Sequence, residues 1–381
     1  MYRITLCDLS THHEKDIYAT GSSTLTAYNI KLSEKVNGYG TLTMSFPNTQ
    51  KIVDTEYGLN SVITVYDDNE NVLWSGIVIS IKDDMFGCTH LTAYGMLWIL
   101  TFQLLIPKVW NYPDTIGNVT SWIASHNNVD EGSGTSINPN YEIGFSFDGG
   151  EYADPVYDVS TEGTTLDTLK KLCEPYYYFY PTYSAPLNPY LYGNPLITIN
   201  IASTNSADNK VNQPIAFGLN LLEYMNESSI ANYKTSVAPI GKDGNGNIVT
   251  VGSVSGQNGS GYIKLAPSII AEYGERRVRV NFDNISDPNQ LYQAGSKWLQ
   301  NNAFQELTLT IKAADLALLT STSFAEFKVG YWVDVNIVPF GIKTSLPILE
   351  KNYDLVNPAK SALTISNTYQ ISLSEILRGK S

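Results

Sequence analysis

The side chains best suited to nucleophilic chemistry are few and lie far apart along the chain. Its three cysteines and four histidines are Cys7, Cys88, Cys173, His12, His13, His90 and His126. A catalytic cysteine–histidine pair meets only in the folded chain, so the sequence leaves such a pair open. The cysteines lack the close C-x-x-C spacing of a zinc site, and their odd number argues against a disulfide framework. We expect three packed thiols from a reducing compartment, and histidines in surface or structural positions.

Paired carboxylates and a glycine-rich loop are the next candidates, for a cation or a phosphate. Asp67-Asp68 and Asp83-Asp84 could bind a cation, but the regular spacing of oxygen ligands in calcium loops is missing. Gly241–Gly246 is not followed by Lys-Ser/Thr, so it predicts a hairpin tip rather than a phosphate loop. A dinucleotide fingerprint and an HExxH helix are also missing from the sequence. We therefore predict no catalytic, cofactor-binding or metal-binding residues, and a protein that is not an enzyme.

A run of five aromatic residues spans positions 176–180. In a strand, alternation places Tyr176, Tyr178 and Tyr180 on one face and Tyr177 and Phe179 on the other. Tyrosine combines a flat apolar face with a hydroxyl, which suits saccharide or protein partners. Burial on both faces, by a core and by a neighbouring subunit, explains the run without a ligand, and we favour it. The predicted partner contacts are Tyr176, Tyr178 and Tyr180, and a saccharide is the alternative.

Composition narrows the classes of protein to which the chain can belong. With 381 residues, of which 43% are hydrophobic, it is long enough for two to four domains. A formal net charge of −13 argues against a dedicated nucleic-acid binder. It is compatible with a passage along which DNA slides, and equally with acidity that serves only solubility. The N-terminus lacks the apolar region of a signal peptide. The longest apolar run, Met96–Ile106, is short of the roughly 20 residues of a membrane span, so we expect a soluble protein.

The N-terminal quarter of the sequence has the pattern of short strands joined by turns. Residues 27–47 alternate apolar and polar side chains around an Asn-Gly turn, which predicts a β-hairpin. Residues 61–66, 72–81 and 89–94 predict further strands. Gly76 interrupts one of them and is a predicted bulge. Five or six short strands at this spacing are typical of a small barrel or sandwich.

The middle of the chain mixes helices with strands. Residues 115–125 and 164–174 carry apolar side chains at helical spacing, and Thr164 or Thr165 can cap the second helix. Strands are predicted at 176–180 and 196–201. A helix is also predicted to begin at Asp287, because Asp287 can cap it and Pro288 occupies its first turn.

Strand patterns return near the C-terminus, at residues 307–312, 329–337, 346–350 and 362–365. The predicted fold is a β-rich, multidomain α+β protein with a small β-barrel near each end and α+β domains between them. The predicted domains are a first β-barrel at 1–104, an α+β domain at 105–230, a small β-rich domain with a connecting helix at 231–302, a second β-barrel at 303–373 and a tail at 374–381.

The order of several segments resembles the phage tail hub family, also called tail-associated lysins or prophage endopeptidase tail proteins. The segments are Ala27–Pro47, Tyr57–Asp67, Leu73–Ile81, Leu91–Gly95, Thr165–Leu172, Ala238–Gly241, Tyr273-Gly274, the Asp287 helix, Leu307–Leu316 and Phe327–Val335. Each segment is degenerate, so the resemblance depends on their shared order over residues 20–370. It concerns the hub portion of the family.

The resemblance implies a structural protein of the virion, at the phage tail tip or baseplate, made in the host bacterial cytoplasm. Family hubs are homotrimers whose barrels alternate in a ring that docks on the distal tail protein ring. The tape measure protein, receptor-binding proteins or a tail fibre, and passing DNA are the further implied partners. The chain stops soon after the last predicted strand, so we expect no appended hydrolase. The alternatives are a tail-associated cell-wall hydrolase and a carbohydrate-binding tail-tip protein.

Overall fold

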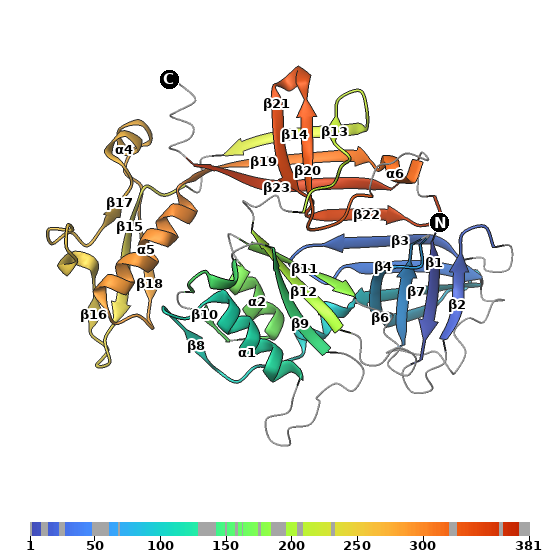
Figure 1. Ribbon diagram of the computed structural model, residues 1–381, viewed down its shortest axis with the longest axis horizontal. Helices are drawn as coiled ribbons and strands as arrows, with labels where there is room; N and C mark the ends of the chain where they lie inside the picture. The colour runs from blue at the N-terminus through green and yellow to red at the C-terminus, as the bar shows by residue number, and fades with distance from the viewer. Residues whose placement is uncertain are drawn as a thin grey trace.

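The computed structural model describes residues 2–8, 14–22, 27–47, 61–67, 69–128, 142–148, 151–156, 159–161, 163–173, 177–183, 196–203, 209–229, 233–319, 326–357 and 361–372. Within these residues, one curled sheet of eleven strands runs through both ends of the chain (Figure 1). In spatial order its strands are β14 (Leu221–Ser229), β19 (Phe304–Ala314), β23 (Ala362–Ser372), β22 (Glu350–Asp354), β3 (Tyr28–Lys35), β4 (Thr41–Pro47), β7 (Cys88–Gly95), β6 (Val72–Asp83), β5 (Val62–Tyr66), β1 (Arg3–Cys7) and β2 (Glu14–Ala19).

The β3–β4 hairpin has the alternating burial that its sequence predicts. Leu42, Met44 and Phe46 point into the core of the N-terminal β region, and each is at most 1% exposed. In the turn, Asn37 adopts a left-handed backbone conformation with φ of 54°, which asparagine tolerates better than most residues. The side-chain Oδ1 of Asn37 accepts a hydrogen bond from the backbone N–H of Phe179 at 2.9 Å. The hairpin therefore also anchors the middle region of the chain.

The bulge predicted at Gly76 is wrong in position. Gly76 pairs regularly with Ile63 and with Gly95, and the irregularities in β6 fall between Val72 and Trp74 and between Val78 and Ser80. A Cβ on Gly76 would lie 2.3 Å from the ring of Trp74 and 2.4 Å from the carbonyl oxygen of Tyr94. Glycine is required at this position because an indole ring and a neighbouring strand approach the backbone closely.

The middle of the chain packs two helices on a small sheet. Helices α1 (Ile116–Asn128) and α2 (Thr165–Cys173) share a core with the sheet of β11 (Tyr177–Tyr183), β12 (Leu196–Ser203) and β9 (Glu142–Asp148). The predicted cap of α2 is confirmed, because the backbone N–H of Asp167 donates to the Thr164 hydroxyl at 3.1 Å. The short pieces around them are η2 (Met96–Thr101), η3 (Glu151–Ala153) and the two-stranded sheet of β8 (Val109–Trp110) and β10 (Val159–Ser160).

A separate β-rich region follows and lies at the left of Figure 1. Its sheet consists of β15 (Ser236–Lys242), β16 (Ile248–Val249), β17 (Ile263–Lys264) and β18 (Arg277–Phe282), with η4 (Val251–Ser253) and α4 (Pro267–Tyr273) beside it. Helix α5 (Pro288–Asn302) contributes Leu291, Ala294 and Leu299 to its core. The predicted cap is confirmed, because the N–H of Gln290 donates to the Asp287 carboxylate at 2.8 Å.

The C-terminal β region has a second layer. A three-stranded sheet of β13 (Ile215–Ala216), β20 (Trp332–Ile337) and β21 (Ile342–Pro347) shares a core with β19 and β23 of the large sheet. Helix α6 (Leu316–Leu319) follows β19, and η5 (Val338–Phe340) joins β20 to β21. Val333, Val335 and Ile337 alternate inward along β20, which accounts for its regular sequence pattern.

The predicted β-rich fold with a few helices is confirmed, and its two terminal β regions share one hydrogen-bonded ladder. Strands β3 and β22 pair antiparallel, with Leu32 opposite Tyr353 and Lys35 opposite Glu350. The sequence had placed these strands in different domains, and its domain boundaries stay a prediction. Among the described residues, no helix has both the length and the apolar character needed to cross a bilayer.

Candidate functional site

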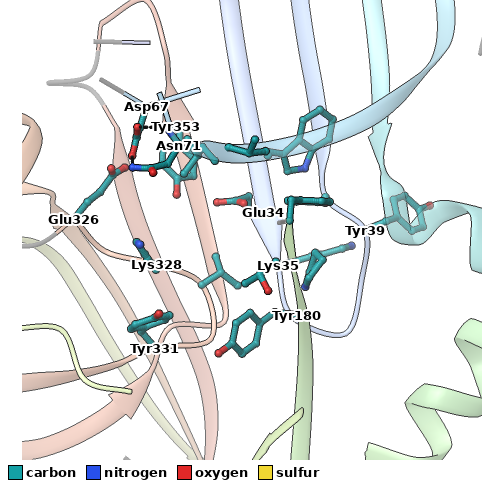
Figure 2. A pocket seen from close by; sticks show the side chains of 18 of the residues that line it. Glu34, Lys35, Tyr39, Asp67, Asn71, Tyr180, Glu326, Lys328, Tyr331 and Tyr353 are labelled. Atoms are coloured by element: carbon teal, nitrogen blue, oxygen red, sulfur yellow. Dashed lines mark hydrogen bonds between the residues drawn. The ribbon is translucent and has the colours of Figure 1, made fainter. Parts of the chain in front are cut away.

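A pocket of about 210 Å³ lies where the N-terminal and C-terminal β regions join. We call it the seam pocket (Figure 2). Its lining residues come from β3 and the following turn, the β5–β6 loop and the start of β6, β11, the segment before β20, and β22: Glu34, Lys35, Gly38, Tyr39, Gly40, Asp67, Asn71, Val72, Leu73, Trp74, Tyr180, Pro181, Thr182, Tyr183, Glu326, Lys328, Val329, Tyr331 and Tyr353. The pocket therefore forms only when distant parts of the chain fold together.

A buried lysine organises one wall of the seam pocket. The Nζ of Lys351 donates to the carboxylates of Asp315 at 3.0 Å and Glu326 at 2.8 Å, and to the carbonyl oxygen of Phe327 at 2.7 Å. The side chains of Lys351 and Asp315 are each 1% exposed. A buried charge of this kind is tolerated only when it is paired and hydrogen-bonded, as this one is. The cluster fixes Glu326, which is partly exposed, at the edge of the pocket.

Glu34 occupies the middle of the pocket in the view of Figure 2. Burial raises the pKa of the Glu34 carboxyl to about 7; Lys351 opposes this increase and Glu326 adds to it. Burial and the nearby Glu34 and Glu326 carboxylates raise the pKa of the Tyr353 hydroxyl well above its ordinary value. Near neutral pH, Glu34 therefore exists in both protonation states and can donate or accept a hydrogen bond.

Aromatic side chains form much of the remaining wall. Tyr39, Tyr183 and Tyr331 are partly exposed, whereas Tyr353 is buried with the Nζ of Lys351 4.0 Å from its ring centroid. The Tyr183 hydroxyl donates to the carbonyl oxygen of Ser75 at 3.2 Å, which fixes the orientation of its ring. The pocket thus offers flat apolar faces together with both hydrogen-bond donors and acceptors.

Two of the three predicted tyrosine contacts, Tyr178 and Tyr180, lie on described β11, and Tyr180 lines the pocket. Tyr178 is 2% exposed and Tyr180 is 5% exposed, and both pack against Val36 and Ala202 of the same chain. The Tyr178 hydroxyl donates to the carbonyl oxygen of Gly330 at 2.9 Å. The chain's own residues therefore cover this face of β11. Tyr176 lies outside the described residues, and contact of these tyrosines with a partner stays a prediction.

The predicted acidic pairs shape the loops in which they occur. Asp67 Oδ1 accepts from the backbone N–H groups of Asn69 and Asn71 at 2.8 Å each. Asp84 Oδ1 accepts in the same way from Phe86 and Cys88, at 2.9 Å each. These are turn geometries that need no cation. Asp68 lies outside the described residues, and within the described part of the chain no group of three or more potential metal ligands gathers.

His90 links two strands through a serine and an aspartate. Its Nδ1 lies 2.9 Å from Ser45 Oγ, and its Nε2 lies 3.0 Å from Asp84 Oδ2. Serine hydrolases use the same three residue types, but there the serine contacts Nε2 and the aspartate contacts Nδ1. Ser45 is buried on β4 directly opposite His90, so the arrangement is that of a cross-strand polar pair.

The other described cysteines and histidine lie in different surroundings. Cys7 and Cys173 are buried thiols, and Cys88 Sγ accepts a hydrogen bond from the Tyr28 hydroxyl at 2.8 Å. His126 stacks on Trp122 with ring centroids 3.6 Å apart. His12 and His13 lie outside the described residues.

A second surface feature was not predicted from the sequence. Six large apolar side chains are 52–74% exposed around β14, which ends the large sheet: Phe217, Leu219, Leu222, Met225, Val338 and Phe340. We call them the apolar edge. The rings of Tyr224 and Phe340 stack at 5.0 Å between centroids, so η5 lies against β14. Single exposed apolar residues are ordinary, but several of them beside a strand that ends the described sheet make a candidate contact surface.

Comparison with known proteins places this architecture among phage tail proteins. Residues 209–376 match the family described as prophage endopeptidase tail. The fold is similar to that of a prophage tail protein from Listeria monocytogenes EGD-e (13% identity, 99% of this chain and 97% of that chain, TM-score 0.55). It is also similar to a tail protein from Neisseria meningitidis MC58 (10% identity, 96% of each chain, TM-score 0.57).

A third similar structure is the 43 kDa tail protein of prophage MuSo2 from Shewanella oneidensis (13% identity, 98% of this chain and 99% of that chain, TM-score 0.57). No curated protein sequence matches the chain. The likeness to these three structures concerns the fold, and the family match concerns the C-terminal part of the chain. The resemblance to phage tail proteins that the sequence predicts is confirmed.

Proposed function

We propose that this protein is a structural hub of a phage or prophage tail tip. The proposal starts from the match of residues 209–376 to the prophage endopeptidase tail family. In the proposal, three copies form a ring that docks on the distal tail protein and borders the channel for DNA. The tape measure protein, and receptor-binding proteins or a tail fibre, are its further partners. The role is mechanical and uses no catalytic residue.

The shared sheet supports a ring-building role. Because β3 pairs with β22, the N-terminal and C-terminal β regions of one subunit are held in a fixed relation. We propose that each region acts as a small barrel, so that three subunits present six similar units to a six-fold neighbour. Rings of this type close through heterologous contacts, in which two different surfaces of neighbouring subunits meet.

The observation that carries the proposal is the apolar edge, which lies within the part of the chain that matches the tail family. Strand β14 ends the sheet, and on its outward face Leu222 and Met225 are exposed. An exposed apolar end strand is costly in an isolated protein, because it invites pairing with other chains. Burial of this edge against a neighbouring copy would remove that cost.

The charge of the chain is consistent with DNA that passes without binding. A formal net charge of −13 repels phosphates, whereas proteins that bind DNA neutralise phosphates with lysine and arginine. The proposal therefore predicts no measurable retention of double-stranded DNA at physiological salt. A gel-shift measurement with the assembled ring tests this part of the proposal.

Light scattering coupled to size exclusion tests assembly directly. We expect a trimer, alone or with the distal tail protein, and a shift to monomer in the double variant Leu222→Lys, Phe340→Lys. The matched control is Ile248→Lys, because Ile248 is 71% exposed on the separate region of β15–β18. A wild-type chain that stays monomeric and never joins the distal tail ring would contradict the proposal, as would a double variant that assembles normally.

The non-enzymatic role can be tested with purified cell walls. Glu34 and Glu326 both line the seam pocket, and two carboxyl groups are the usual machinery of glycoside hydrolysis. We expect no release of reducing ends from peptidoglycan over hours at pH 5–8. Release that disappears in the Glu34→Gln variant would show that the chain is a hydrolase.

A further inference from the structure

We propose that the seam pocket binds a single neutral sugar ring of a glycan. The inference concerns the single chain, whose own residues line the pocket. It rests on the size of the pocket, on the kinds of side chain that line it, and on how firmly these side chains are held.

The lining combines the two features that a pyranose needs. Sugar rings present apolar C–H faces, which pack on aromatic rings, and a rim of hydroxyl groups, which both donate and accept hydrogen bonds. Tyr39, Tyr183 and Tyr331 supply partly exposed aromatic rings. The side chains of Asn71 and Glu326 supply an amide and a carboxylate at the same pocket. A volume of about 210 Å³ suits one ring rather than an extended chain.

The charges of the lining favour a neutral ligand over an ion. The carboxyl groups of Glu34, Asp67 and Glu326 and the ammonium groups of Lys35 and Lys328 line the same pocket, so neither sign of charge dominates it. Lys328 is also exposed, with its Nζ 5.9 Å from the ring centroid of Tyr331, so its charge lies beside that aromatic face. A hydroxyl-rich ligand can hydrogen-bond to groups of both signs without a charge of its own.

The pocket is largely fixed before a ligand arrives. Glu326 is held by Lys351, and the ring of Tyr183 is held by its hydrogen bond to the Ser75 carbonyl oxygen. Gly330 accepts from the Tyr178 hydroxyl, and a Cβ on Gly330 would lie 2.4 Å from the ring of Tyr180. The segment that carries Lys328 and Tyr331 is therefore seated firmly on β11. Walls that are already ordered reduce the entropy lost on binding.

Glu34 adds adaptability at the centre of this rigid frame. Its carboxyl can act as donor or acceptor near neutral pH, since burial raises its pKa to about 7. A sugar hydroxyl can also donate or accept, so it can form a hydrogen bond with Glu34 in either protonation state of the carboxyl.

Saturation-transfer NMR and titration calorimetry on the full chain test the proposal. The probes are the methyl glycosides of glucose, galactose and N-acetylglucosamine, which distinguish neutral hexoses from the amino sugars of cell walls. Tetramethylammonium and inorganic phosphate serve as the cation and anion probes. We expect at least one glycoside to bind, with an affinity about tenfold lower in Tyr331→Ala and largely retained in Tyr331→Phe.

The matched control is Tyr262→Ala, because Tyr262 is an exposed tyrosine on the β15–β18 region that also has a cation beside its ring, with Arg277 4.8 Å from the ring centroid. Thermal melting confirms that each variant is folded. Three results would overturn the proposal: no glycoside binds the wild-type chain, one of the two ions binds in preference to every glycoside, or Tyr331→Ala binds as well as wild type. Because all of these measurements are made on the isolated chain, their failure leaves the hub proposal intact.

Discussion

The seam and the apolar edge lie at two ends of one stretch of sheet, and their strands differ in how they are paired and covered. At the seam, β22 pairs with β3, and a buried lysine is enclosed by carboxylates of the same chain. At the other end, β14 pairs on one side with β19 and shows exposed leucine and methionine on its surface. The first end is completed within one chain, whereas the second leaves apolar side chains exposed, and we propose that a partner covers them.

The two ends should therefore respond differently to substitution. Variants at the seam should lower the free energy of unfolding of the single chain. Variants at the apolar edge should change association and leave that free energy nearly unchanged. The predictions below test this division, beginning with the largest expected effect.

Removal of the buried charge at the seam should be the most damaging change. Lys351→Met keeps the apolar stem but leaves Asp315 buried without its cation, which we expect to lower the free energy of unfolding by about 3–5 kcal/mol. Urea unfolding followed by fluorescence measures the change. The control is Lys312→Ala, which breaks the exposed pair with Glu223 and should cost about 0–1 kcal/mol. Equal losses in the two variants would contradict the special role of the seam.

The stability of the chain should fall as pH rises toward neutrality. The folded-state pKa of Glu34 is about 7, above its ordinary value of 4.5, so the folded chain holds this proton more tightly than the unfolded chain. The resulting stability is fully present below pH 4.5 and is lost by about pH 7, with a total of up to about 3 kcal/mol.

Urea unfolding at several pH values measures this loss as the difference between wild type and Glu34→Gln. The glutamine variant stays neutral at every pH, so the difference isolates the contribution of one carboxyl. A difference that is constant from pH 4.5 to pH 7 would contradict the assignment.

The anchor of the β3–β4 turn should have an intermediate effect. In Asn37→Ala the buried N–H of Phe179 loses its side-chain acceptor, and we expect a loss of about 1–2 kcal/mol. Asn37→Asp keeps an acceptor oxygen and serves as the conservative control. Thermal unfolding of the two variants should separate them by several degrees, and indistinguishable melting would exclude this contact as an anchor.

The apolar edge should give the smallest effect on the single chain. Leu222 is 63% exposed, so Leu222→Lys should change the free energy of unfolding by less than about 0.5 kcal/mol. The same substitution should weaken self-association, measured by sedimentation at several concentrations. A large loss of stability without any change in association would show that this edge is completed within the chain.

Much of the local structure could be predicted from the sequence, because its signals act over a few residues. Asp287 and Thr164 cap their helices as predicted. Leu42, Met44 and Phe46 are buried, as their alternation with polar residues predicts. Gly76 shows where such reasoning fails. Its strand was correct, but the reason for glycine lies in Trp74 and in the backbone of the neighbouring strand, contacts that no local pattern reports.

The residues of the candidate site were much harder to predict from the sequence. Lys351 and Glu34 are charged residues in or beside predicted strands, and a charge in a strand is ordinarily expected to face solvent. The residues of the apolar edge lie partly on β14, a strand that the sequence analysis did not predict. Their exposure depends on which strand ends the sheet, and that is a property of the assembled fold.

By itself, the sequence determined many of the strands and helices, the caps at Thr164 and Asp287, and the order of segments shared with phage tail proteins, since these depend on residues close together in the chain. The tertiary structure alone decided that β3 pairs with β22, and that Glu34 and Glu326 meet around one pocket. Any two strands can form the backbone hydrogen bonds of a sheet. The packing of the whole molecule therefore decides which distant strands pair.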